Sequence, residues 1–292
     1  MPARVRLLAL DIDGTLLDTR YQLPPRNREA LEAAHRAGVE IVLVTGRRYA
    51  FALPVAELLP FDLVLMASNG AVIRSRSGQP YERFLLPVPV AASILDLTRP
   101  WLDYALLAYD VEGEGQLVIE SMGKRTPNFL SWLERNRRFV DFAPLEATLA
   151  ARGAGQPPAR EPEEPLQVMY SGPLSAMRGI ATTLDAAPFR SEFQLTKTFY
   201  EGRDLGIMDL IHPACSKGSG LKDWAEHRGI PREQIMAVGD NFNDLEMLDY
   251  AGVPVVMGNA VPELQGDGRR VTLDNDSAGL AVAVEQWALP NS

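Results

Sequence analysis

Short apolar runs that end abruptly at polar residues are the feature that most constrains this sequence. Each reads as a buried strand, and they cover residues 5–10, 39–44, 63–67, 235–238 and 253–257. Helical patterns lie between them at residues 25–37, 219–228 and 244–251, each followed by the glycine that often ends a helix. Strands and helices that alternate in this way predict an α/β fold with an open, mostly parallel, Rossmann-like sheet.

The middle of the chain breaks this alternation. Strand-like runs at 104–110 and 116–121 predict a hairpin, and further strands at 166–171, 193–199 and 205–211 accompany a helix at 174–186. We therefore expect an inserted α+β domain at 86–210, between two core segments at 1–85 and 211–292. The stretch 151–165, rich in proline and glycine, is predicted to be a mobile loop of the insert.

Composition narrows the class of protein. Apolar residues make up 46% and charged residues 23%, a balance typical of a globular chain. The formal net charge of −9 argues against a nucleic-acid partner, and no apolar run approaches the roughly 20 residues of a membrane span. With no secretion signal and a single cysteine, Cys215, we expect a cytoplasmic protein, either a monomer or a weak homo-oligomer.

Polar residues follow the ends of four predicted strands. They occupy residues 11–15, 45–47, 68–70 and 239–244. In an open α/β sheet ligands bind at the carboxyl edge of the strands, so we expect these distant segments to meet at one pocket.

Four of these polar residues are acids. Asp11 and Asp13 are two residues apart, so their side chains share one side of an extended chain, and Asp240 and Asp244 would join them at the sheet edge. Mutual repulsion would raise the pKa values of these carboxyl groups or require a cation, for which Mg²⁺ is the best candidate. The alternative is that they only cap helices and form turns.

The same residues predict phosphoryl chemistry on a small anionic ligand. Asp11 can attack phosphorus and form an aspartyl-phosphate, while Asp13 serves first as general acid and then as base. Lys217 and Thr45 can neutralise and bind the phosphate oxygens. Arg47 could grip a phosphate or carboxylate or be solvated, and Asn243 could hold the phosphate or the metal's waters or cap a helix.

In order along the chain, these motifs resemble those of the haloacid dehalogenase-like phosphatases, specifically the Cof-type branch. The matching segments are Asp11-x-Asp13-Gly-Thr, Thr45-Gly46-Arg47, Asn69-Gly70-Ala71, Lys217-Gly, Gly239-Asp240-x-x-Asn243-Asp244, Met257-Gly-Asn-Ala260 and residues 275–280.

The resemblance implies a Rossmann-like core interrupted after its third strand by a cap domain of the C2B type. It implies that Asp11 is the nucleophile and Asp13 the acid/base. Around the phosphate it implies Thr45, Gly46, Lys217 and Asn243, whereas the role of Arg47 varies within the family. Mg²⁺ would be held by the side chains of Asp11 and Asp240 and the main-chain oxygen of Asp13, with Asp244 close by.

Three functions are compatible with these residues. The leading hypothesis is Mg²⁺-dependent hydrolysis of a sugar phosphate or similar small phosphorylated metabolite. A phosphomutase or phosphotransferase that passes the phosphoryl group to another sugar hydroxyl is the second. A non-enzymatic signalling module that stores phosphate on Asp11 is the third, and the acid/base at Asp13 argues against it because it would shorten the life of an acyl phosphate.

Overall fold

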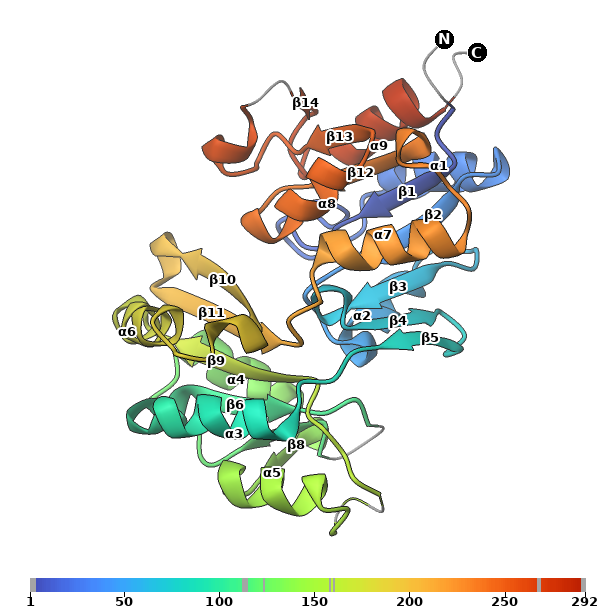
Figure 1. Cartoon of the computed structure of the whole chain (residues 1–292). Coiled ribbons are helices and arrows are strands. Elements are labelled where there is room, and N and C mark those ends of the chain that lie inside the picture. Colours follow the sequence, from blue (N-terminus) through green and yellow to red (C-terminus); the bar gives the residue numbers. More distant parts are fainter. Residues whose placement is uncertain are drawn as a thin grey trace. The chain divides into compact units, whose positions relative to one another are not determined.

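The computed structural model describes residues 4–111, 115–122, 124–157, 159, 161–266 and 269–289. Contacts divide the chain into two compact units (Figure 1). Unit 1 combines the chain up to Arg83 with the chain from Cys215 onward, and unit 2 is Phe84–Ala214. The turn predicted between residues 111 and 115 lies largely outside the described residues.

Unit 1 is built on an eight-stranded sheet with the order β14-β13-β12-β1-β2-β3-β4-β5. The strands are β1 (Leu7–Leu10), β2 (Glu40–Val44), β3 (Val64–Ala67), β4 (Val72–Ser75), β5 (Pro80–Arg83), β12 (Ile235–Gly239), β13 (Val253–Val256) and β14 (Arg270–Val271). Pairing is parallel from β14 to β3, and β4 and β5 add an antiparallel hairpin. The predicted Rossmann-like sheet, with all five of its strands, is confirmed.

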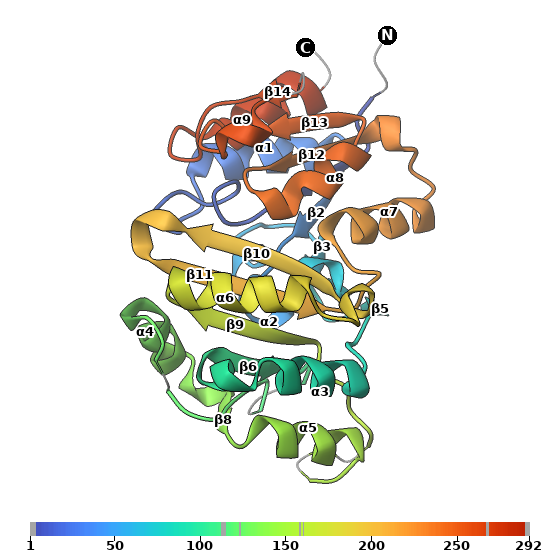
Figure 2. The same ribbon diagram turned by 60° about the vertical axis from the view of Figure 1, so that its left-hand side comes forward.

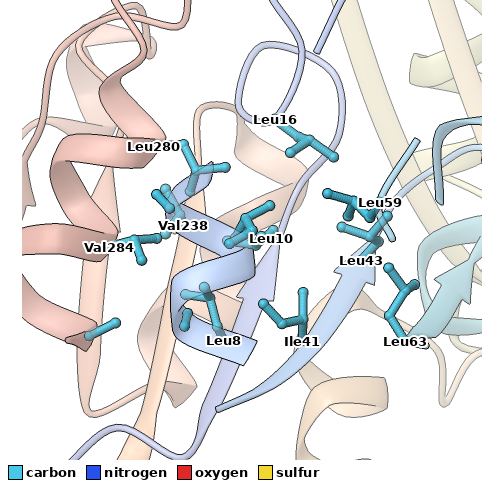
Figure 3. Close-up of a cluster of buried hydrophobic side chains, with 14 of the residues drawn as sticks. Leu8, Leu10, Leu16, Ile41, Leu43, Leu59, Leu63, Val238, Leu280 and Val284 are labelled. Carbon is cyan, nitrogen blue, oxygen red and sulfur yellow. The ribbon is translucent and has the colours of Figure 1, made fainter. Parts of the chain in front are cut away.

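Helices cover both faces of this sheet because successive side chains of a buried strand point to opposite faces. They are α1 (Pro25–Arg36), α2 (Tyr49–Ala56), α7 (Lys217–His227), α8 (Leu245–Tyr250) and α9 (Gly279–Ala283). Figure 3 shows one cluster, in which Leu8 and Leu10 of β1 pack with Leu280 and Val284 near the C-terminus. On the other face, Leu7 and its neighbours pack with side chains of α7 and α8.

The predicted helices are confirmed with small shifts at their ends. Gly38 and Gly229 end α1 and α7 in the left-handed region, with φ of 82° and 61°. Gly252, which follows α8, is needed for lack of space and not for its φ. A Cβ at this position would lie 2.6 Å from the Cα of Glu233. Among the described residues, none of the helices combines the length and hydropathy needed to cross a membrane.

Unit 2 contains a six-stranded sheet with the order β10-β11-β9-β6-β7-β8, in which only β7 and β8 pair in parallel. The strands are β6 (Ala105–Ala108), β7 (Leu117–Ile119), β8 (Val140–Phe142), β9 (Gln167–Gly172), β10 (Gln194–Tyr200) and β11 (Leu205–Ile211). The helices are α3 (Val88–Leu97), α4 (Pro127–Arg135), α5 (Leu145–Gly153) and α6 (Leu174–Asp185). Helices α3 and α6 lie side by side along one face of the sheet (Figure 2). The predicted β6–β7 hairpin is confirmed.

The prediction of a loop at 151–165 is wrong at the start of that stretch. Its first three residues form the last turn of α5. Arg152, only 3% exposed, donates hydrogen bonds to Glu163 Oε2 at 2.7 Å and to the Gly115 carbonyl at 3.2 Å. One buried arginine thus ties the stretch to the unit, a long-range contact that local composition does not reveal.

Candidate active site

The candidate site lies at the carboxyl edge of unit 1's sheet, where the strand order reverses. From the central strand β1 the chain adds β2 and β3 on one side, and β12 and β13 lie on the other. Asp11 follows β1 and Asp240 follows β12, so both carboxylates lie at the switch point. This is the position at which open α/β sheets bind their ligands.

Lys217 connects two of the predicted acids at this point. Its Nζ lies 2.5 Å from Asp11 Oδ1 and 2.6 Å from Asp244 Oδ1, and the lysine is only 1% exposed. The lysine is the first residue of α7, which Ser216 caps by accepting a hydrogen bond from Ser219 N at 3.0 Å. The cap fixes the start of α7 and therefore the position of the lysine.

Three carboxylates form a cluster around this lysine. In the described part of the chain, one oxygen each from Asp11, Asp240 and Asp244 lies within 4.8 Å of the others. The second oxygen of Asp244 accepts hydrogen bonds from the main-chain amides of Asp240 at 2.9 Å and Asn241 at 3.0 Å. These amides hold the Asp244 carboxylate against the start of the 240–244 loop.

Burial makes this cluster electrostatically unfavourable without a cation. Burial raises the pKa of Asp11 well above its ordinary value, Lys217 lowers it, and repulsion from Asp244 and Asp240 raises it again. Burial and the charge of Asp244 raise the pKa of Asp240 to about 7 against the opposing effect of Lys217. Three oxygen donors, of which only two are paired with the lysine, suit a hard divalent cation such as Mg²⁺, whose charge would favour the ionised carboxylates.

Asp13 has a different partner. Arg47 donates from Nε to Asp13 Oδ2 at 2.7 Å and from Nη2 to Asp13 Oδ1 at 2.5 Å. Burial lowers the pKa of Arg47, but the hydrogen bonds and charge of Asp13 outweigh this effect and raise it. The sequence suggested a carboxylate or phosphate as a target for Arg47, but did not indicate that the target is Asp13. The arrangement fixes the orientation of the Asp13 carboxylate.

Thr45, Gly46 and Asn243 meet around Asn69. The buried Thr45 Oγ1 accepts from Arg47 N at 3.1 Å, and the Thr45 carbonyl accepts from Asn69 N at 2.9 Å. Asn243 donates to Asn69 Oδ1 at 3.4 Å, and a Cβ at Gly46 would lie 3.3 Å from that oxygen. The cap of the short turn at 242–244 is Asn241, so the alternative of Asn243 as a cap is wrong. All four predicted segments meet in unit 1.

Sequence reasoning gave no role to a set of residues that supports the Asp11–Thr15 loop. Gly14 has φ of 85°, and a Cβ there would lie 2.4 Å from Asp240 Oδ2. Asn259 donates to the Gly14 carbonyl at 2.9 Å and accepts from Asn275 N at 2.9 Å. Both asparagines lie in segments that resemble the Cof-type branch, and this resemblance was the only sequence signal that could have indicated their role.

Comparison with known proteins identifies the family. The model of the haloacid dehalogenase-like hydrolases matches residues 8–142 and 161–284. The chain belongs to this family. A Bacillus subtilis relative, phosphatase YwpJ, is 30% identical over 287 residues that cover 95% of this chain and 98% of that protein. Pyridoxal phosphate phosphatase YbhA of Escherichia coli is 27% identical and covers 94% of this chain and 96% of that protein.

A solved structure agrees with this assignment. A haloacid dehalogenase-like hydrolase from B. subtilis superposes with a TM-score of 0.76 at 26% identity, covering 97% of this chain and 99% of that one. The chain is thus an enzyme, a phosphatase of the haloacid dehalogenase-like family. Enzymes of this family generally use a metal ion, and the Asp11, Asp240 and Asp244 cluster offers oxygen donors for one.

Proposed function

We propose that this haloacid dehalogenase-like enzyme hydrolyses a small phosphate monoester, a sugar phosphate or similar metabolite, through a phosphorylated Asp11. The observation that carries the proposal is the position of Lys217, which is buried and bonded to both Asp11 and Asp244 beside Asp240. At this switch point of the sheet, Asp11 supplies a nucleophile and the buried lysine supplies a cation for the phosphoryl group.

The reaction takes two steps at these side chains. An Asp11 carboxylate oxygen bonds to phosphorus as the ester P–O bond breaks, and Asp13 gives its proton to the leaving oxygen. Water then attacks the phosphorus of the acyl phosphate, Asp13 takes the water's proton, and the bond to Asp11 breaks to release phosphate. Arg47 keeps the Asp13 carboxylate oriented through its two hydrogen bonds.

The proposed cation is Mg²⁺. The side chains of Asp11 and Asp240 and the main-chain oxygen of Asp13 would hold it, with Asp244 close by, which the carboxylate cluster supports. When bound, it would neutralise the negative charge of the phosphoryl group and the nucleophile.

We assign the phosphate oxygens to Lys217, Thr45, Asn243 and the main chain at Gly46. The backbone contacts that join Thr45 and Asn69 support this assignment. For unit 2 we propose the role of a C2B-type cap that selects the organic part of the substrate. We place the reaction in the cytoplasm, in keeping with a single cysteine, Cys215, that is buried and free.

Release of p-nitrophenol from p-nitrophenyl phosphate, followed with and without Mg²⁺ and EDTA, tests the proposal. Asp11→Asn should abolish turnover, and acid-quenched wild-type enzyme should carry substrate phosphate on Asp11. Asp249→Asn is the matched control because it removes an exposed carboxylate on α8, and it should keep wild-type activity. Full activity of Asp11→Asn, or full activity in EDTA, would contradict the mechanism.

A further inference from the structure

A cavity of about 400 Å³ lies in unit 1 at the opposite edge of the sheet from the acidic cluster. It is lined by the first residues of β2 and β3, Glu40 and Val64, and by His227, the last residue of α7. The catalytic Lys217 is the first residue of that helix, so the two sites lie at its two ends. This volume is within the range of small-molecule sites, roughly 300–1,000 Å³.

Aromatic rings form one side of the cavity. Tyr81 on β5 is 42% exposed, and its ring lies 4.8 Å from the ring of the buried Trp224, centroid to centroid. The His227 ring lies 5.4 Å from Trp224. His35 also lines the cavity and stacks on Phe61 at 4.5 Å with an interplanar angle of 11°. Such rings offer flat surfaces on which a planar ligand can stack.

The polar groups of the cavity fall into two sets. Glu40 is fully engaged, since it accepts from Trp224 Nε1 at 2.7 Å and from Arg228 Nε at 2.9 Å. Within the described residues, the imidazoles of His35 and His227 and the hydroxyl of Tyr81 make no hydrogen bond to the protein. The first set is paired within the protein, and the second, on the exposed side chains of His35, His227 and Tyr81, leaves donors and acceptors for a ligand.

Charge sets the class of ligand. The charge of Arg228 is balanced by Glu40 at 2.9 Å, and the rim carries one further carboxylate, Asp62. A cavity without excess positive charge does not favour a phosphorylated compound. Its aromatic rings and unused imidazoles instead suit an uncharged heteroaromatic ring, whose nitrogen and carbonyl groups can exchange hydrogen bonds with them.

We propose that this cavity is a second ligand site, which binds a nucleobase or nucleoside through stacking on Tyr81 and hydrogen bonds to His35 and His227. The site is distinct from the acidic cluster, to which we assign the cation and the nucleophile. A ligand here contacts the C-terminal end of α7, whose N-terminal residue is Lys217.

Calorimetric titration of the full-length protein in Mg²⁺ with adenosine tests the site, because adenosine carries no phosphate that the enzyme could remove. We expect saturable one-to-one binding of adenosine and none of ribose. Tyr81→Ala should weaken binding about tenfold or more through loss of stacking, whereas Tyr81→Phe should keep most of the affinity. His227→Ala should weaken it by a smaller factor, and Tyr200→Ala, an exposed tyrosine of unit 2, should leave it unchanged.

Two results would overturn the proposal. One is the lack of saturable adenosine binding at millimolar concentration. The other is adenosine binding that survives both Tyr81→Ala and His227→Ala. If Asp11→Asn removes this surviving binding, adenosine binds at the acidic cluster. Because heat of binding is measured without turnover, either result is independent of the phosphatase test.

Discussion

Replacing Lys217 with methionine should destabilise unit 1 more than any surface change. The substitution keeps most of the buried volume but leaves Asp11 and Asp244, now 2.5 Å and 2.6 Å from the lysine nitrogen, without their shared cation. Breaking a buried ion pair on one side costs about 3–5 kcal/mol. At this chain length such a loss lowers the melting temperature by on the order of 10 °C.

The size of the Lys217→Met effect should depend on pH. Without the lysine the folded pKa of Asp11 rises further above its unfolded value, so the folded state binds more protons than the unfolded state. The deficit should therefore be large at pH 8 and shrink as the pH falls toward 5. Added Mg²⁺ should also reduce it, because a bound cation stabilises only the folded cluster.

Calorimetry or circular dichroism melts in EDTA at pH 8 and pH 5 measure this effect. Lys222→Met is the matched control, since Lys222 lies on the same helix with a side chain 55% exposed and its Nζ 3.9 Å from Glu226. It should cost no more than about 0.5 kcal/mol. If Lys217→Met melts like this control, or loses the same stability at both pH values, the electrostatic account of the cluster is wrong.

Three further perturbations have definite outcomes. Gly14→Ala places a Cβ 2.4 Å from Asp240 Oδ2 at a φ of 85°, and it should lower kcat at least about tenfold. Gly78→Ala is the control, because Gly78 has a φ of 91° but open space around it. It should cost only about 1 kcal/mol of stability and leave the activity unchanged. Arg47→Lys replaces two hydrogen bonds to Asp13 with a point charge. The kcat/KM of this variant should fall up to about 100-fold, whereas its melting temperature should not change. Wild-type rates in the variant would exclude an orienting role for Arg47. Burial raises the pKa of Asp209 in unit 2 to about 7, above its unfolded value of 3.8, so the wild type should lose stability as pH rises through this range. Asp209→Asn should remove this loss of stability. If the melting temperatures of the wild type and the variant change in parallel from pH 5 to pH 8, this account of Asp209 is wrong.

The fold was predictable where local pattern and burial agree. Strands such as β1 and β12 are buried on both faces, so they appear in the sequence as apolar runs. Helix α2 was not predicted because its sequence is almost wholly apolar and contains Pro54, which hides any helical period. The β4–β5 hairpin was missed because β5 begins with Pro80 and is largely exposed.

The candidate site was predictable as a set of residues but not as a set of contacts. Polar residues at strand ends indicated which segments meet, because parallel strands share one carboxyl edge. Which side chain pairs with which depends on long-range packing, so neither the bond from Arg47 to Asp13 nor that from Lys217 to Asp244 follows from spacing. The support of the Gly14 carbonyl by Asn259 is of the same kind.

The interrupted order of unit 1 has a consequence for synthesis of the protein. The central strand β1 needs β2 from the first segment and β12 from the last, and Asp11 precedes Lys217 by 206 residues. A ribosome adds about 5–20 residues per second, so roughly 10–40 s separate the nucleophile from its lysine. Throughout that interval one edge of an apolar strand has no native partner and is open to pairing with another nascent chain.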